Sequence, residues 1–244
     1  MLVYDDIGRG IPLVLIHGLG SRKEAWKPQY ELAANYRLII PDLRGHGQSS
    51  LNDNLSLHNF AKDIGNLLDV LQIPSAFICG LSLGGIVAQE LYKQRPDIVK
   101  GLVLSNTLSY IPSFAAFHPL TNASRQLKRD RQRLIEQIAR TSVYDQSFKE
   151  EAMDAFQIRD TYLTAAKAPV GINYFPILPT IKKPVLLMGS THDRVTPYMN
   201  IYLMRLYIRN VRTALFWKTG HLSNIERKES FNQQLKNFME ANVS

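Results

Sequence analysis

The stretch from Ala76 to Arg95 constrains the fold more than any other part of the sequence. The apolar run Ala76 to Cys79 is typical of a buried strand, and a helical pattern follows it and stops at a proline after Arg95. Between them lies Gly80-Leu81-Ser82-Leu83-Gly84, a Gly-x-Ser-x-Gly sequence in a strand–turn–helix context. Such a turn exposes the serine hydroxyl at the end of a sheet, and side chains at positions 80 and 84 would collide with it. The context predicts that Ser82 is a nucleophile.

The five-residue string is weak evidence by itself, because a chain of this length contains one by chance roughly one time in ten. The competing interpretation is a glycine-rich turn with a bystander serine. Only residues elsewhere in the chain can distinguish a nucleophilic serine from a bystander serine.

Apolar runs alternate with helical patterns along most of the chain, which implies crossover connections and a parallel sheet. The expected strands are Leu2–Tyr4, Pro12–Ile16, Tyr36–Ile40, Ala76–Cys79, Val99–Leu104, Pro184–Gly189 and Val211–Trp217. From residue 110 to residue 181 the pattern changes to charged, helix-prone sequence. We therefore expect an α/β core formed by residues 1–109 and 182–244, with a helical cap, or lid, inserted at residues 110–181.

Three polar residues follow three of the expected strands, in the chain order Ser82, Asp193, His221. Active sites of open α/β sheets gather along the edge where the strands end. A serine alcohol needs a base, which a neutral histidine can supply before returning the proton to the leaving group. A carboxylate on the other ring nitrogen fixes the tautomer of the histidine. The three residues are therefore predicted to be a catalytic triad.

Two backbone N–H groups are expected to form an oxyanion hole. Leu83 directly follows the nucleophile, and Leu19 lies in His17-Gly18-Leu19-Gly20, where glycines allow a close approach of the backbone. Loss of one such donor typically raises the barrier by about 2.7–4 kcal/mol.

Other residues compete for these roles. Asp42 also follows a strand and is the rival acid, while His221 could instead cap the last helix. The remaining histidines near strand ends are expected to hold loops or to lie at the surface: His17, His46 and His192. No set of His or carboxylate residues has the spacing of a metal site, so neither a metal nor a cofactor is expected.

Together these motifs resemble the α/β-hydrolase-fold enzymes, in the group of small-lid esterases, lactonases and carbon–carbon hydrolases. The resemblance spans the chain from Leu2 onward, and its segments are His17–Gly20, Asp42–Ser49, Gly80–Gly85, Gly189–Asp193 and Gly220-His221. It implies hydrolysis of a small carboxylic ester, thioester or lactone through an acyl-enzyme on Ser82. Serine at position 82 argues against the dehalogenase and epoxide-hydrolase branches, which have aspartate there. Members usually carry a further N-terminal strand, for which this sequence has no room, so we expect about seven strands.

Two other functions remain open at this point. One is a ligand receptor or signalling protein that keeps the pocket without turnover. The other is an acyltransferase or perhydrolase that uses the same triad. Turnover of an ester distinguishes the first from a hydrolase, and product analysis with competing nucleophiles distinguishes the second.

The formal net charge of +8 bears on partners, and six lysines and arginines lie between Arg125 and Arg140. This segment is either a solvated helix face or a means of steering an anionic acyl substrate. No nucleic-acid motif accompanies it, so nucleic-acid binding is not expected. The single cysteine, Cys79, excludes an internal disulfide, and neither a signal-peptide pattern nor an apolar run of roughly 20 residues is present. We expect a cytoplasmic enzyme without a membrane span, and the oligomeric state and the substrate remain open.

Overall fold

Seven strands form one sheet in the computed structural model, which describes residues 2–50 and 53–243 and only the backbone of residues 115–120 and 128. The strand order is β1-β3-β2-β4-β5-β6-β7. Only β1 runs antiparallel to its neighbour; the other pairs are parallel. The strands are β1 Tyr4–Ile7, β2 Ile11–Ile16, β3 Tyr36–Pro41, β4 Ala76–Leu81, β5 Val99–Ser105, β6 Val185–Ser190 and β7 Val211–Phe216. The predicted α/β fold, with seven rather than eight strands, is confirmed.

The expected position of the first strand, Leu2–Tyr4, is wrong: the strand begins two residues later and ends three residues later. Strand β1 extends through Asp5 and Asp6, whose charges hide an edge strand from a search for apolar runs. Asp6 pairs with Arg37 on β3 at 2.7 Å, and Asp5 accepts a hydrogen bond from Lys23 at 2.8 Å. The strand is therefore held by polar partners as well as by the sheet.

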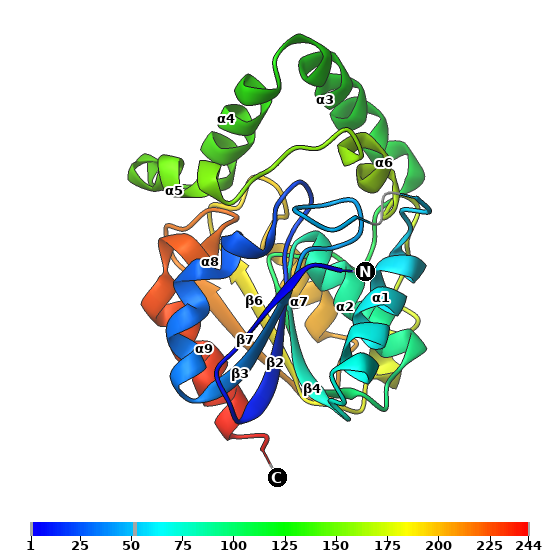
Figure 1. Ribbon diagram of the computed structural model, residues 1–244, viewed down its shortest axis with the longest axis vertical. Helices are drawn as coiled ribbons and strands as arrows, with labels where there is room; N and C mark the ends of the chain where they lie inside the picture. The colour runs from blue at the N-terminus through cyan, green and yellow to red at the C-terminus, as the bar shows by residue number, and fades with distance from the viewer. Residues whose placement is uncertain (1, 51–52, 244) are drawn as a thin grey trace.

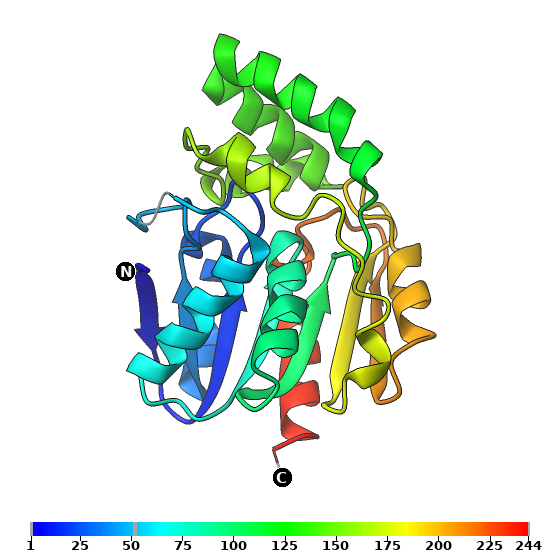
Figure 2. The same cartoon turned by 90° about the vertical axis from the view of Figure 1, so that its right-hand side faces the viewer.

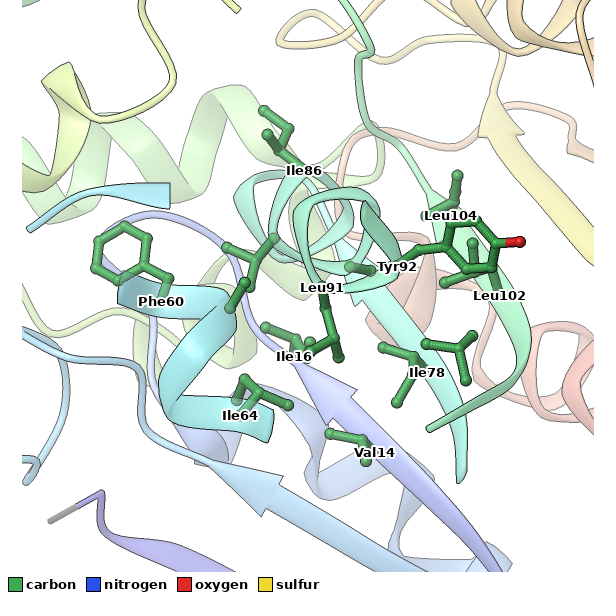
Figure 3. Packing of buried hydrophobic residues seen from close by; sticks show 14 of the residues in the cluster. Val14, Ile16, Phe60, Ile64, Ile78, Ile86, Leu91, Tyr92, Leu102 and Leu104 are labelled. Atoms are coloured by element: carbon green, nitrogen blue, oxygen red, sulfur yellow. The ribbon is translucent and has the colours of Figure 1, made fainter. Parts of the chain in front are cut away.

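Helices cover both faces of the sheet (Figures 1 and 2). Side chains alternate along a strand, so Val14 and Ile16 of β2 belong to one core cluster while Leu13 and Leu15 belong to the other. The first cluster is completed by α1 (Leu57–Val70), α2 (Leu83–Gln94) and α7 (Met199–Arg205), and Figure 3 shows α1 and α2 packed over it. The second is completed by the 3₁₀ helix η1 (Lys23–Ala34), α8 (Ser223–Glu226) and α9 (Lys228–Glu240).

The segment between β5 and β6 contributes helices above the carboxyl ends of the strands (Figures 1 and 2). They are α3 Phe117–Arg129, α4 Arg131–Ser142, α5 Lys149–Asp154 and α6 Tyr162–Lys167, with short 3₁₀ turns at Ser113–Ala116, Gln146–Phe148 and Leu178–Thr180. The helix-prone basic stretch is divided at Asp130, whose carboxylate caps α4 by accepting the N–H of Arg133 at 3.0 Å.

This helical segment is tied to the sheet layer by polar contacts. The hydroxyl of Tyr174 donates to the carboxylate of Glu90 on α2 at 2.7 Å. The backbone N–H of Gln157 donates to Gly20 O at 2.8 Å, and the Ser21 hydroxyl donates to Ala155 O at 2.7 Å. The segment is thus held against α2 and against the loop that follows β2. Across the described ranges, no helix has the length and apolar character that a membrane crossing needs.

Candidate active site

Ser82 occupies the sharp turn between β4 and α2. Its backbone has φ 56° and ψ −119°, a conformation that a residue with a side chain rarely adopts. A Cβ on Gly84 would lie 2.1 Å from Ile16 O, and one on Gly80 would lie 2.2 Å from Gly84 O. Both positions must therefore be glycine for the turn to close. The hydroxyl of Thr107 donates to Ser82 O at 2.6 Å and fixes the turn from the side of β5.

Asp193 and His221 are in direct contact. Nδ1 of His221 lies 2.8 Å from Oδ2 of Asp193, and both residues are buried. Burial alone would raise the pKa of Asp193, but the facing His221 and the hydrogen bonds to the carboxylate lower it to about 2. The carboxylate is therefore charged at neutral pH, and Nδ1 of His221 carries the hydrogen that it accepts. The second ring nitrogen, Nε2, is left without a partner among the described residues.

Four further groups donate to the same carboxylate, which the sequence analysis did not foresee. Oδ1 accepts the backbone N–H of Val195 and of Thr196, each at 2.8 Å. Oδ2 accepts the hydroxyl of Thr196 at 2.7 Å and the side-chain amide of Asn106 at 2.8 Å. Asn106 directly follows β5, at the same sheet edge as Ser82. That position after a strand is the one feature of the sequence that could have indicated Asn106 as a site residue.

Ser82 and His221 line the same cavity, which has a volume of about 350 Å³. Its floor is the sheet edge and its roof includes Leu134 of α4 and Phe156. The side chain of Asp193 is fully buried behind His221. A second cavity of about 280 Å³ also contains Ser82 in its wall. The structure thus brings Ser82 and His221 to one space, with Asp193 supporting the histidine from inside.

The two expected oxyanion donors flank the serine. A Cβ on Gly18 would lie 3.3 Å from Ser82 Cβ, so the loop that carries Leu19 runs directly against Ser82. Leu83 is the first residue of α2. Within residues 2–50 and 53–243, neither the Leu19 N–H nor the Leu83 N–H donates a hydrogen bond. Neither N–H group is therefore committed to an acceptor in the described part of the chain, as a donor of an oxyanion hole would have to be.

Asp42, the rival acid, is engaged by backbone. Its two oxygens accept the N–H of Lys23 and the N–H of Gln48, each at 2.7 Å, and burial raises its pKa. His17 is equally committed, because Nε2 accepts the N–H of Leu43 at 3.0 Å and Nδ1 donates to Gly18 O at 2.8 Å. These contacts hold the loops after β2 and β3 together.

His46 and His192, which were also expected to hold a loop or to lie at the surface, have different surroundings. Burial lowers the pKa of His46 to about 3, and its Nδ1 bonds to Arg44 O at 3.0 Å. His192 is exposed, with its ring 4.3 Å from that of Tyr144. In the described part of the chain, no three His, Cys, Asp or Glu side chains gather as a metal site would require.

Glu226 is a buried carboxylate that sequence reasoning missed. Oε1 accepts the N–H of Gly220, the residue before His221, at 2.7 Å. Oε2 accepts the N–H of Tyr144 and of Asp145, each at 2.9 Å. Glu226 therefore joins the loop of His221 to the chain that leaves α4. A single glutamate near the start of the last helix carries no signal of this role in the sequence.

The basic side chains that are described between Arg125 and Arg140 do not line either cavity. Every side chain described among them is exposed: Arg125, Arg129, Arg131, Arg133 and Arg140. None of these belongs to the wall of either cavity. The solvated-face interpretation of this segment fits the structure, and among the residues whose side chains are described no lysine or arginine lines either cavity beside Ser82.

Comparison with known proteins agrees with this architecture. A family model described as "alpha/beta hydrolase fold" matches residues 11–228. A Mycobacterium tuberculosis protein named non-heme bromoperoxidase BpoC is 30% identical over 97% of both chains. The 3-oxoadipate enol-lactonase 1 of Acinetobacter baylyi is 27% identical over 94% of this chain and 88% of its own. The crystal structure of the enol-lactonase from Burkholderia xenovorans LB400 superposes with a TM-score of 0.89 at 25% identity, covering 98% of this chain and 96% of that one.

The family match covers most of the chain, and the BpoC relative matches it nearly from end to end. The mostly parallel seven-stranded sheet and the strand–turn–helix around Ser82 agree with that match. The chain belongs to the alpha/beta hydrolase fold family.

Proposed function

We propose that this protein is a serine hydrolase that cleaves a small carboxylic ester, thioester or lactone. Ser82 is the nucleophile, His221 the general base and Asp193 the orienting acid. Family membership supports an ester-hydrolysing enzyme, and two of the relatives are named as lactonases, which open a cyclic ester. The observation that carries the proposal is the 2.8 Å contact between Nδ1 of His221 and Oδ2 of Asp193. His221 in turn lines the same cavity as Ser82.

The chemistry follows from this arrangement. Nε2 of His221 takes the proton of the Ser82 hydroxyl as Oγ attacks the carbonyl carbon. The N–H groups of Leu19 and Leu83 stabilise the oxyanion, and Asp193 stabilises the imidazolium. When the tetrahedral intermediate collapses, His221 gives the proton to the leaving alcohol or thiol, and the acyl group stays on Ser82. A water molecule activated by His221 then hydrolyses the acyl-enzyme and restores the free serine.

We further propose that residues 110–181 act as a cap over this site, with residues 1–109 and 182–244 as the core. Roof residues of the 350 Å³ cavity, among them Leu134 and Phe156, come from this segment. A cytoplasmic location rests on cysteine usage and remains a prediction.

Replacement of the nucleophile tests the proposal. Ser82→Ala is expected to lower turnover of a short p-nitrophenyl ester by about 10⁴- to 10⁶-fold with an unchanged melting temperature. A fluorophosphonate probe is expected to label the wild type at Ser82 and to leave the variant unlabelled. Ser230→Ala, on an exposed position of α9, is the matched control and keeps full activity. A Ser82→Ala enzyme that retains a tenth of the activity rejects the mechanism.

A second candidate uses the same acyl-enzyme with a different acceptor. The relative named as a bromoperoxidase favours it. Hydrogen peroxide would replace water, so that attack on the acyl-enzyme releases a peroxy acid and the free serine. Product analysis with an ester substrate and added peroxide decides whether the acyl group leaves as acid or as peroxy acid. A non-turnover receptor, by contrast, would be acylated at most once per chain.

A further inference from the structure

Two cavities meet at Ser82. The first, of about 350 Å³, also has His221 in its wall, and we call it the histidine chamber. The second, of about 280 Å³, has Leu83 in its wall instead, and we call it the leucine chamber. Their shared wall consists of Leu19, Ser82, Ala123, Tyr162 and Val195. A substrate carbonyl placed at Ser82 would therefore have one part of the molecule in each chamber.

The histidine chamber combines an apolar roof, which includes Leu134, Ile138 and Phe156, with a group of neutral polar side chains that the leucine chamber lacks. Asn122 and Gln126 lie one turn apart on α3, and Gln137 lies on α4. Thr141 also lines the chamber, but its hydroxyl already donates to Gln137 O at 2.8 Å. The amide of Gln126 donates to the amide oxygen of Gln137 across the gap between the two helices. An amide offers both a donor and an acceptor, so this wall can bind hydroxyl or amide groups of a ligand. Among its described residues there is no lysine, arginine, aspartate or glutamate.

The leucine chamber is apolar. Its side chains include Ile86 of α2, Ile111, Ala166 of α6 and Val170. Its two threonine hydroxyls already donate elsewhere, Thr107 to Ser82 O at 2.6 Å and Thr196 to Asp193 Oδ2 at 2.7 Å. Such a wall favours a hydrocarbon chain, because apolar surface is removed from water there without leaving polar groups unpaired.

The route of the proton decides which half of an ester enters which chamber. The leaving oxygen must accept the proton held by His221, so the alcohol half has to lie on the histidine side. The acyl half then extends in the opposite direction, past Leu83, whose N–H binds the oxyanion in the proposed mechanism. Polarity and proton transfer thus point to the same orientation.

We infer that the preferred substrates are uncharged, open-chain esters of a medium-length aliphatic acid with a polar, hydroxyl-bearing alcohol. The acyl chain lies in the leucine chamber and the alcohol in the histidine chamber. This assignment rests on the proposed hydrolase function and adds the substrate class to it.

Four esters test it: the glyceryl and propyl esters of hexanoic acid and of acetic acid, with acid release followed by titration. For the wild type, kcat/KM is expected to be about tenfold or more higher for hexanoates than for acetates, and about tenfold higher for glyceryl than for propyl esters. Ala166→Leu fills part of the leucine chamber and is expected to reduce the hexanoate-to-acetate ratio about tenfold, leaving the glyceryl-to-propyl ratio unchanged. Gln137→Leu is expected to reduce the glyceryl-to-propyl ratio about tenfold, leaving the hexanoate-to-acetate ratio unchanged.

Matched controls lie on the same helices outside the cavity walls. Thr164→Leu on α6 and Gln132→Leu on α4 are exposed, and both are expected to keep the wild-type ratios. If either chamber variant fails to fold, Val170→Phe and Gln126→Leu probe the same chambers.

The outcomes separate the inference from the function on which it rests. Variants that exchange their effects, or that change neither ratio while the wild type turns over, overturn the chamber assignment and leave the hydrolase intact. A wild type that hydrolyses none of the four esters and resists the fluorophosphonate probe overturns the hydrolase function itself.

Discussion

The side-chain amide of Asn106 donates a hydrogen bond of 2.8 Å to Oδ2 of Asp193, the oxygen that also faces Nδ1 of His221. Asn106 has a positive φ of 44° and its Oδ1 accepts the hydroxyl of Ser223 at 2.9 Å. Its backbone N–H donates to Met188 O on β6 at 2.9 Å. Asn106 is therefore a positioning residue that holds the carboxylate from the end of the neighbouring strand.

Two substitutions separate the hydrogen bond of Asn106 from its backbone conformation. Asn106→Gly removes the side chain but suits the left-handed conformation, whereas Asn106→Ala removes the side chain and adds strain. Both are expected to lower kcat by about tenfold or more with little change in KM, because the carboxylate loses a donor that orients it. Steady-state kinetics and urea unfolding measure the two effects, and only the alanine variant should show the additional loss of stability from strain. A glycine variant with wild-type kcat contradicts the positioning role.

The sheet was predictable because its signal is local. Buried parallel strands such as β2 and β6 are continuous apolar runs, and the turn at Ser82 requires glycine at fixed positions. The family resemblance then supplied the expectation of seven strands, which the structure confirms. Strand β1 was misplaced because its edge position tolerates the charges of Asp5 and Asp6.

The supporting contacts of the site were not predictable, because they join distant parts of the chain. Asn106 and Asp193 are 87 residues apart and meet only because β5 and β6 are neighbours in the sheet. Glu226 similarly depends on where the chain after α4 returns to the loop of His221. The triad roles of Ser82, Asp193 and His221, and the oxyanion roles of Leu19 and Leu83, stay predictions that the kinetics above can test.

Gly18 offers a test of the space around Ser82, the proposed nucleophile. A Cβ at this position would lie 3.3 Å from Ser82 Cβ and 3.9 Å from Ser82 Oγ, with no positive φ to forbid alanine. Gly18→Ala is expected to lower kcat/KM by about tenfold to a hundredfold, because small displacements of reacting groups have large kinetic effects. Thermal unfolding should show little change in melting temperature.

Gly65→Ala is the matched control for this substitution. The new Cβ would meet side-chain atoms no closer than 3.8 Å inside α1, so it is expected to stabilise the protein by about 0.5–1 kcal/mol without affecting kcat/KM. Full activity in Gly18→Ala would show that the loop carrying Leu19 does not confine the serine.

Glu226 provides a test of the link between the helical segment and the histidine loop. Glu226→Gln replaces one accepting oxygen by an NH₂ group, so at least one of the three backbone N–H groups loses its acceptor. Loss of a partner by a buried polar group costs about 1–3 kcal/mol, and we expect the free energy of unfolding to fall by that amount. Because Gly220 precedes His221, kcat should also fall by about tenfold. Glu229→Gln, exposed on α9, is the control, and identical behaviour of the two variants would refute the link.

The depressed pKa of Asp193 predicts how stability depends on pH. Burial opposes ionisation, but His221, Thr196 and Asn106 outweigh it, and the pKa falls from 3.8 to about 2. A carboxyl whose pKa is lower in the folded than in the unfolded protein stabilises the fold above about pH 4, and that stabilisation is lost as the pH falls from about 5 towards 1. A shift of this size corresponds to a free energy on the order of 2 kcal/mol.

Urea unfolding of the wild type and Asp193→Asn at pH 6 and pH 2.5 measures this contribution. The difference in free energy of unfolding between the two proteins should be larger at pH 6, by an amount on the order of 2 kcal/mol, because only the wild type has a carboxylate to ionise. Asn106→Gly removes one of the donors that lower the pKa, so its pH dependence should lie between those of the wild type and Asp193→Asn. If the difference is the same at both pH values, the carboxylate is not stabilised by its partners, and the ionised Asp193 that the mechanism requires would have to be abandoned.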